Sequence, residues 1–289
     1  TVGAAMAGES YLSMAWGSLA MTVSKMIIVN FFRPRETFIL PAFTGIREVL
    51  QFGSIASLAS IIKEVGSAAP DLIFGRTLGF VDVAFFSRGI GLHRMALERV
   101  NTLVRNVHFP TFAADLRSGG VAAQLYGRAT NYLLAVTAPM LAVLAVLSEP
   151  LILFVFGAQW ERSVPIAAIM CTASILTAPF SLYGLSLTAS GHVSTYLRAE
   201  VAAQAFRVLV LLSSISLTLE QVVALLSLAY LFEAAMSQRA LRLAFGLDSM
   251  ALFRQVWRSF ALIPFSVAGP ALSVWVSRHF GYADTQRLS

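Results

Sequence analysis

The scarcity of charged residues is the feature that most constrains what this chain can fold into. Only 12% of its 289 residues are Asp, Glu, Lys or Arg, whereas 57% are hydrophobic. Soluble domains carry about 25% charged residues, so this chain has about half the charge that a water-facing surface needs. The composition excludes a soluble globule. It also excludes a disordered chain, because so apolar a sequence can bury far more surface than the ordering of its residues costs.

Long apolar segments recur along the sequence and predict helices that cross a membrane. A helix needs roughly 20 residues to span the hydrocarbon core, and the sequence lacks the alternating ten-residue segments of a membrane β-barrel. The predicted fold is an all-α, polytopic transmembrane bundle of about eight helices. We expect spans at 3–32, 46–74, 80–112, 121–147, 164–189, 196–217, 219–245 and 259–276. We expect a re-entrant or interfacial connection at 148–163, and a loop with an amphipathic piece at 246–258.

The basic residues, all of them arginines except Lys25 and Lys63, predict the orientation of the chain. When the loops are assigned to alternate sides, one side carries Arg33, Arg35, Arg47, Arg117, Arg198, Arg239, Arg242, Arg254 and Arg258. The other side carries Arg76, Arg162, Arg278 and Arg287, accompanied by acidic residues. Because positively charged loops face the cytoplasm, we expect the first side to be cytoplasmic. The first apolar span begins almost at once, without the charged leader of a signal peptide, and we expect the chain to be a fragment of a longer protein.

Ionisable side chains are concentrated in the predicted third span. One stripe about 80° wide carries Arg94, Glu98, Asn101, Arg105 and His108, and a second face carries Arg88, Arg99 and Asn106. A charge in hydrocarbon is costly and normally faces a water-filled cavity or a partner. We therefore predict a substrate-binding lumen lined by Arg88, Arg94, Arg99, Asn101, Arg105 and His108. The alternative is that Arg94 pairs with Glu98 one turn away, while Arg105 and His108 extend to the membrane edge.

The second and sixth predicted spans carry weaker polar stripes. Glu64 and Asp71 lie one heptad apart on a stripe with Lys63. A buried carboxylate in such a setting can take up and release a proton, so Glu64, Asp71 and Glu98 are candidates for ion coupling. The alternative is that they form salt bridges with Lys63 or with arginines of the third span. Glu200, Gln204 and Arg207 form the stripe of the sixth span, where we expect an internally neutralised pair.

No motif in the sequence predicts an enzyme. There is no phosphate-binding loop, nucleophile elbow or HExxH sequence, and the four histidines do not have metal-ligand spacing. The single cysteine, Cys171, excludes an intramolecular disulfide. We expect no catalytic residues, no metal, no cofactor and no nucleic-acid partner.

Six short blocks of the sequence resemble the motifs of bacterial polysaccharide flippases. The blocks are 72–79 (LIFGRTLG), 84–89 (AFFSRG), 108–112 (HFPTF), 153–160 (LFVFGAQW), 164–166 (VPI) and 187–191 (LTASG). In this order they resemble the Wzx-like exporters of the multidrug/oligosaccharidyl-lipid/polysaccharide flippase superfamily. The second block departs from the family pattern at Phe86 and Gly89, where Tyr and Ala are usual.

The resemblance implies two lobes of similar topology around a central cavity. It assigns 1–32 to the last helix of the N-terminal lobe, 33–47 to a cytoplasmic inter-lobe linker and 48–289 to the helical bundle of the C-terminal lobe. It implies a flippase of the bacterial inner membrane that translocates a polyprenyl-diphosphate-linked oligosaccharide for lipopolysaccharide or exopolysaccharide synthesis. Its expected partners are this substrate, membrane lipids, a polysaccharide polymerase and glycosyltransferases. A cationic lumen suits such a substrate, because arginine pairs bidentately with phosphate.

Two alternatives remain at this point. One is a drug or lipid-precursor exporter of the same superfamily, although exporters of cationic drugs need acidic cavities rather than arginines. The other is a membrane glycan ligase or polymerase, which usually carries a large outer loop, whereas the longest outer loop expected here is the modest 148–163 segment.

Overall fold

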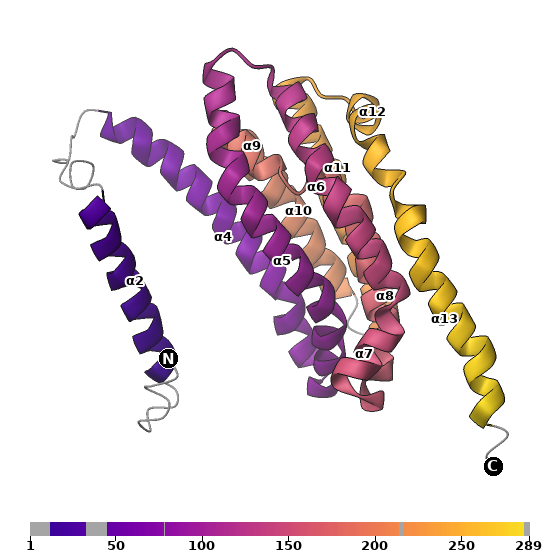
Figure 1. Cartoon of the computed structure of the whole chain (residues 1–289). Coiled ribbons are helices and arrows are strands. Elements are labelled where there is room, and N and C mark those ends of the chain that lie inside the picture. The colour runs from indigo at the N-terminus through magenta and orange to yellow at the C-terminus, as the bar shows by residue number, and fades with distance from the viewer. Residues whose placement is uncertain (1–11, 33–44, 78, 214–216, 286–289) are drawn as a thin grey trace. The chain divides into compact units, whose positions relative to one another are not determined.

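The computed structural model describes residues 12–32, 45–77, 79–213 and 217–285. Within these ranges every regular element is a helix, so the all-α prediction is confirmed (Figure 1). The chain divides into two compact units, Thr1–Leu50 and Gln51–Ser289, and each is described by itself.

The first unit contains α2, Leu12–Phe32, and the beginning of α4. The helix α2 is apolar, and large side chains such as Met26, Phe31 and Phe32 are exposed on it. Of the linker predicted at 33–47, residues 33–44 lie outside the described residues. The helix α4 begins directly after Gly45, which has a positive φ of 80° and whose carbonyl accepts hydrogen bonds from the amides of Glu48 and Val49.

The second unit is a bundle of long helices with short connections. The helix α4 (Ile46–Thr77) continues into it, followed by α5 (Phe80–Arg117), α6 (Ala122–Val146), α7 (Ser148–Phe156), η1 (Ala158–Ser163), α8 (Val164–Thr177), η2 (Ala178–Phe180), α9 (Tyr183–Ala189), α10 (Val193–Ser213), α11 (Leu219–Phe245), α12 (Ser249–Phe260) and α13 (Ile263–Thr285). The predicted connection at 148–163 consists of α7 and the 3-10 helix η1. The predicted loop at 246–258 is mostly the helix α12. Figure 1 shows α7 and α12 at opposite ends of this unit.

Helix ends follow from local chemistry. Gly79 precedes α5 and Gly157 follows α7, with φ values of 89° and 94° that residues with a side chain rarely adopt. The helix α11 begins with a capping box between Thr218 and Gln221. It ends at Gly246, in the left-handed conformation typical of a helix C-terminus.

The predicted span at 164–189 is interrupted in its middle. The helix α8 ends at Thr177, and a short 3-10 turn containing Pro179 leads into α9. Proline cannot donate a backbone hydrogen bond, which favours a break at this position. The carbonyl of Pro179 instead accepts a hydrogen bond from the hydroxyl of the buried Tyr126, with an oxygen–oxygen distance of 2.7 Å.

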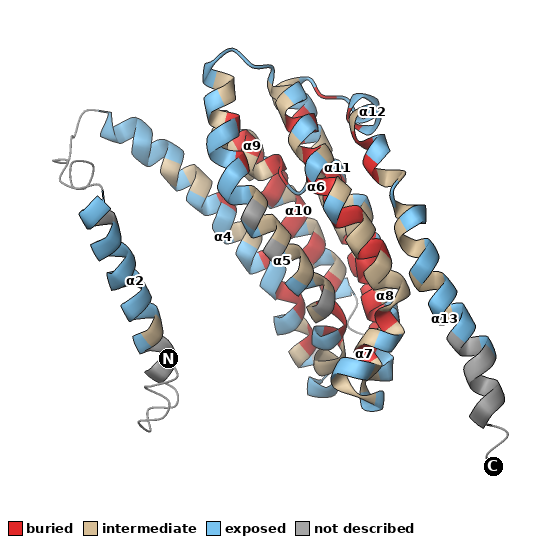
Figure 2. Cartoon of the chain, in the orientation of Figure 1, coloured by how far each residue is buried: buried red, intermediate tan, exposed pale blue. Residues whose placement is uncertain are grey.

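Fewer helices than the eight expected spans are long and apolar enough to cross a membrane. By length and composition, the described residues contain four such segments: Ile46–Arg76, Ala122–Val146, Ala158–Ala189 and Leu219–Phe245. The bent pair formed by Ser249–Phe260 and Ile263–Val276 adds a fifth if it is one span. The helices α5 and α10 are also long, but they carry the polar stripes noted in the sequence. Figure 2 shows that exposed residues cover much of the outer faces of the bundle.

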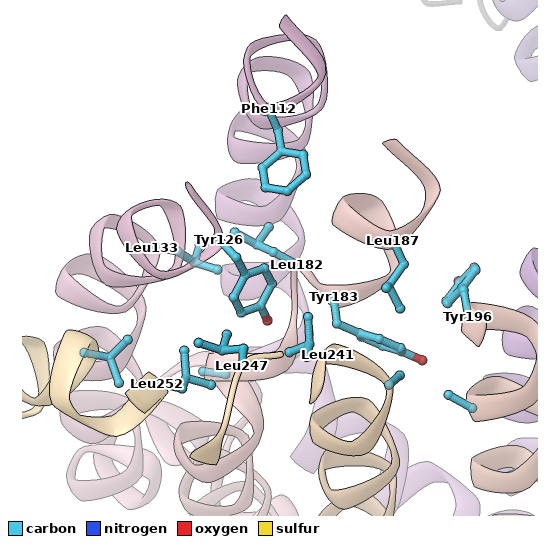
Figure 3. Packing of buried hydrophobic residues seen from close by; sticks show 14 of the residues in the cluster. Phe112, Tyr126, Leu133, Leu182, Tyr183, Leu187, Tyr196, Leu241, Leu247 and Leu252 are labelled. Atoms are coloured by element: carbon cyan, nitrogen blue, oxygen red, sulfur yellow. The ribbon is translucent and has the colours of Figure 1, made fainter. Parts of the chain in front are cut away.

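Two apolar clusters hold the second unit together. The larger contains Tyr126, Leu182, Leu241 and Leu247, which Figure 3 shows gathered from α6, the start of α9, α11 and the residues after α11. The smaller contains Phe74 and Phe86, whose rings meet edge to face at 4.8 Å. The polar residues described next lie beside these clusters.

Candidate functional site

A polar cavity of about 250 Å³ lies within the second unit. Its walls come from α4, α5, α6, α8, α9 and α11. The polar side chains on these walls include Lys63, Asn101, Thr137, Ser181, Tyr183 and Glu233. Ammonium, amide, hydroxyl and carboxylate groups therefore face one space inside an otherwise apolar bundle. Such a space can hold water or the polar part of a ligand through hydrogen bonds.

Behind the part of the cavity wall formed by Lys63 and Tyr183, the carboxylate of Glu200 is completely buried and accepts hydrogen bonds from three side chains. The Nζ atom of Lys63 lies 3.3 Å from Oε1, and the hydroxyl of Tyr183 donates to the same oxygen. The amide nitrogen of Gln204 lies 3.0 Å from Oε2. A buried charge is stable only when it is paired and its remaining hydrogen-bonding sites are filled. The three donors from α4, α9 and α10 meet this requirement.

A second buried pair joins α10 to α11. The guanidinium of Arg207 donates to Glu233 and also lies over the ring of Tyr230, 4.6 Å from its centre. The expectation of an internally neutralised pair on the sixth span is therefore wrong. Glu200 and Arg207 are both paired, but with residues of other helices, because their side chains point into different neighbouring helices.

The predicted stripe on α5 crosses the border between the packed face and an exposed flank of the helix. Asn101 lines the cavity. His108 is buried, and its Nε2 atom lies 2.9 Å from Oγ of Ser186 in α9. These two members of the stripe face the interior of the bundle.

The charged members of the stripe face outward. They are Arg94, Glu98 and Arg105, all exposed in the second unit. They lie about 20–60° beyond Asn101 around the helix, which turns them from the packed face onto the flank. In the part of the chain that the structure describes, no ion pair joins Arg94 to Glu98. Nothing in the structure tests whether this flank faces a lumen, so that remains a prediction.

The ion-coupling candidates on α4 also lie outside the cavity. Glu64 and Asp71 are exposed, whereas their neighbour Lys63 turns inward to Glu200. Lys63 therefore pairs with Glu200, and not with Glu64 or Asp71. The side chain of Arg99 on α5 lies outside the described part of the structure, so its predicted role is unchanged.

The blocks that resemble flippase motifs meet at two places in the second unit. At the α7 end, Arg88 of the second block lies over the rings of Phe156 and Trp160, at 5.3 and 5.4 Å from their centres. A Cβ atom at Gly89 would lie 2.7 Å from Cγ2 of Ile166 in the fifth block. At the other place, His108 of the third block contacts Ser186, which directly precedes the sixth. Arg88 was predicted to line the lumen, and its observed partners are aromatic rings.

The α7 end contains further contacts between α5 and η1. Arg162 lies 3.3 Å from Asp82 and 5.0 Å from the ring centre of Phe85. The hydroxyl of Ser163 donates to the backbone carbonyl of Phe85 at 2.8 Å. Arg88 and Arg162 thus attach η1 to the first turns of α5, at the end of the unit opposite α12.

Sequence reasoning missed Glu233 and Tyr183. A signal for Glu233 was present, because it is the sole acidic residue in the interior of the apolar segment 219–245, and an ionisable residue inside a span usually has a function or a partner. Tyr183 carried no comparable signal, since tyrosines occur throughout the chain. Among the described residues, no group of three or more His, Cys, Asp or Glu side chains could hold a metal ion.

The helices and the cavity define a class: a membrane protein that is helical throughout its described elements, with an internal cavity whose lining includes the charged side chains of Lys63 and Glu233. The chain belongs to a family described as polysaccharide biosynthesis protein, whose model matches residues 1–165. This range includes α2, α4, α5, α6 and α7.

Two characterised relatives support this assignment at low identity. The chain is 25% identical over 156 residues to the teichuronic acid biosynthesis protein TuaB of Bacillus subtilis, covering 53% of this chain and 32% of the relative. It is 25% identical over 174 residues to the succinoglycan biosynthesis transport protein ExoT of Rhizobium meliloti, covering 60% and 35%. The aligned segment is therefore about a third of the length of each relative. No solved structure matches the chain.

Proposed function

We propose that this chain is part of a flippase that moves a polyprenyl-diphosphate-linked oligosaccharide across the bacterial inner membrane. Three observations support the proposal. The family concerns polysaccharide biosynthesis, one relative is named a transport protein, and the chain has four to five helices suited to a membrane. The transport role is favoured over an enzymatic one by the relative's name and by the lack of a catalytic motif in the sequence.

The arrangement of α5 is the single observation that carries the proposal. The same helix contributes Asn101 to the polar cavity and presents Arg94 and Arg105 on the adjacent flank. Arginine stays charged when partly desolvated and binds phosphate oxygens in a bidentate manner. A diphosphate could therefore lie along the flank while hydroxyl groups of the sugar exchange hydrogen bonds with the polar side chains of the cavity.

The proposal includes an organisation for the whole protein. Residues 1–32 would be the last helix of an N-terminal lobe, 33–47 an inter-lobe linker and 48–289 the C-terminal lobe. The flank of α5 would face the N-terminal lobe across a lumen, and the two lobes would rock around it as in other transporters. The arginine-rich end, which carries Arg117, Arg254 and Arg258, would be cytoplasmic. A polysaccharide polymerase and glycosyltransferases are the proposed protein partners.

The test uses the full-length protein in cells that depend on it for glycan export. Arg105→Ala should lower the apparent affinity for the lipid-linked oligosaccharide about tenfold or more, because a hydrogen bond to a charged group contributes roughly 1.5–3 kcal/mol. Arg105→Lys should restore export only in part, because an ammonium group makes a single point contact. The measurement is the ratio of surface glycan to lipid-linked oligosaccharide that accumulates in the inner leaflet.

Arg198→Ala provides the matched control. Arg198 is an exposed arginine on α10 that does not line the cavity, and its removal changes the net charge equally. Normal export by both Arg105→Ala and Arg94→Ala, at normal protein abundance, would refute a phosphate-binding role of the α5 flank.

A further inference from the structure

The helix α12 has three faces of different chemistry. One face, with Leu252 and Val256 only 3% and 1% exposed, packs against α6. A second face carries Phe253 and Trp257, which are 54% and 55% exposed. Arg254 and Arg258, which are both exposed, occupy the third face. Measured around the helix from Leu252, the aromatic face lies at about 100–140° and the basic face at about 200–240°. Figure 2 shows buried and exposed residues alternating along this short helix.

The rotation of α12 about its own axis is set by contacts with α6. The hydroxyl of Ser259 lies 2.7 Å from Oδ1 and 2.9 Å from the carbonyl oxygen of Asn131. Gly127 permits close approach, because a Cβ atom there would lie 1.3 Å from Oε1 of Gln255. With these contacts in place, the aromatic and basic faces are turned away from α6.

The charge on the outer face of α12 is not neutralised locally. Asp248, directly before the helix, is already paired with Arg242 at 3.0 Å. Within the described ranges, neither Arg254 nor Arg258 has an acidic partner. The exposed surface of this helix is thus an apolar strip next to a positively charged strip without acidic partners. A binding partner that is complementary to this surface must present an apolar region next to a negatively charged one.

An apolar groove of about 770 Å³ runs beside the aromatic face. It lies between α12 and the helices α8 and α11, and its walls include Leu176, Phe180, Phe253 and Trp257. A groove of this size and lining can accept a lipid chain. The axis of α12 is bent by 42° from that of α13, so the helix departs from the direction of the adjoining apolar segment.

We propose that α12 is an interfacial helix that binds an anionic phospholipid leaflet. Phe253 and Trp257 enter the acyl chains, and Arg254 and Arg258 contact the headgroup phosphates. Amphipathic helices with aromatic residues on the apolar side and arginines on the polar side bind the membrane surface in this way. The inference depends on the chain lying in a membrane, and not on which molecule it transports.

The first test measures lipid preference with the purified chain in nanodiscs of phosphatidylcholine with or without phosphatidylglycerol. Each basic residue near an anionic surface contributes about fivefold to binding. The preference for phosphatidylglycerol should therefore fall about 25-fold in Arg254→Gln/Arg258→Gln, measured by counting retained lipids with native mass spectrometry. Arg198→Gln/Arg239→Gln removes the same charge from exposed positions on α10 and α11, which we also expect on the cytoplasmic side, and should lower the preference less than the α12 double variant does. Equal losses in both double variants would overturn the assignment to α12.

The second test asks what covers the aromatic face. In membranes that contain lipids brominated on the acyl chain, tryptophan fluorescence is quenched on contact with the bromine atoms. Trp257→Phe should remove a measurable share of this quenching. Trp275→Phe is the positive control, because Trp275 is exposed on the apolar helix α13 and should also be quenched. If Trp257→Phe leaves the quenching unchanged, the aromatic face is covered by protein, such as a second copy, and the proposal is wrong. Both substitutions are at exposed positions, so unfolding does not confound the comparison.

Discussion

Two charged regions of the second unit differ in whether their charges already have partners. The paired core consists of Lys63, Glu200, Arg207 and Glu233, in which each charge meets an opposite one from another helix. The α5 flank consists of Arg94, Glu98 and Arg105, which are exposed. Lys63 and Glu233 of the paired core line the polar cavity, and the α5 flank lies on the same helix as Asn101, which also lines it.

The difference indicates what each region contributes. Breaking a buried pair leaves an uncompensated charge and strongly destabilises a protein, whereas an exposed charge contributes little to stability. The paired core therefore connects α4, α10 and α11, and its removal should lower the stability of the fold. The flank can be altered at little cost to the fold, so any effect of its removal should be detected in ligand binding.

The largest expected effect is the loss of one partner in the paired core. Arg207→Ala leaves Glu233, which is 19% exposed, without its cation, and should lower the free energy of unfolding by about 3–5 kcal/mol. Thermal unfolding of the purified chain in detergent measures this loss. The apolar double variant Arg207→Met/Glu233→Leu should recover most of it, because neither charge is then buried alone. A loss below about 0.5 kcal/mol would show that the Arg207–Glu233 pair contributes no more to stability than an ordinary surface ion pair.

A smaller loss is expected from removing one donor to Glu200. Tyr183→Phe deletes the hydroxyl that donates to this fully buried carboxylate, and should cost about 1.5–3 kcal/mol. Tyr132→Phe, at a residue that is 75% exposed on α6, is the matched control and should change stability by less than about 0.5 kcal/mol. Equal melting temperatures for the two variants would show that Lys63 and Gln204 alone satisfy Glu200.

The packed face of α5 can be compared with its flank by adding a single methyl group. Gly89→Ala places a Cβ atom 2.7 Å from Ile166 and 3.0 Å from the carbonyl oxygen of Ser163, and should destabilise the chain by about 1–3 kcal/mol. Gly91→Ala is the control on the same helix. A Cβ atom at Gly91 would meet no atom of another helix within 4 Å, so this change should be neutral or stabilising by up to about 1 kcal/mol. A neutral Gly89→Ala would mean that α5 and α8 can separate without cost.

The helices were largely predictable from the sequence, because each apolar run ends at a glycine, a proline or a charged residue. The interruption at Pro179 was not predicted, because the apolar run around it predicts one continuous span. At 246–258 the sequence predicts a loop with an amphipathic piece, and this piece is the helix α12. Short amphipathic helices acquire their stability from packing, here against α6, which a linear pattern does not reveal.

The site was less predictable than the fold, for a physical reason. A helical stripe identifies which side chains share a face but does not specify which other helix that face meets. Glu200 and Arg207 lie two turns apart on α10, yet one is paired with α4 and the other with α11. On α5, a shift of about 20–40° separates Asn101, in the cavity, from the exposed Arg94 and Arg105. Such a rotation is decided by packing between helices.

The smallest effect on stability, and the sharpest test of the comparison, is expected at Arg94. Arg94→Ala should change the free energy of unfolding by less than about 0.5 kcal/mol, because Arg94 is exposed and, in the described structure, forms no ion pair with Glu98. In the full-length protein, the same variant should weaken binding of the lipid-linked oligosaccharide about tenfold or more, if Arg94 contacts phosphate.

The double variant Arg94→Ala/Glu98→Ala separates the two roles of Arg94, phosphate binding and neutralisation of Glu98. It should remain defective if Arg94 binds phosphate, because the lost contact is not replaced. Normal export by the double variant would instead show that Arg94 serves to neutralise Glu98, and the α5 flank would then resemble the paired core.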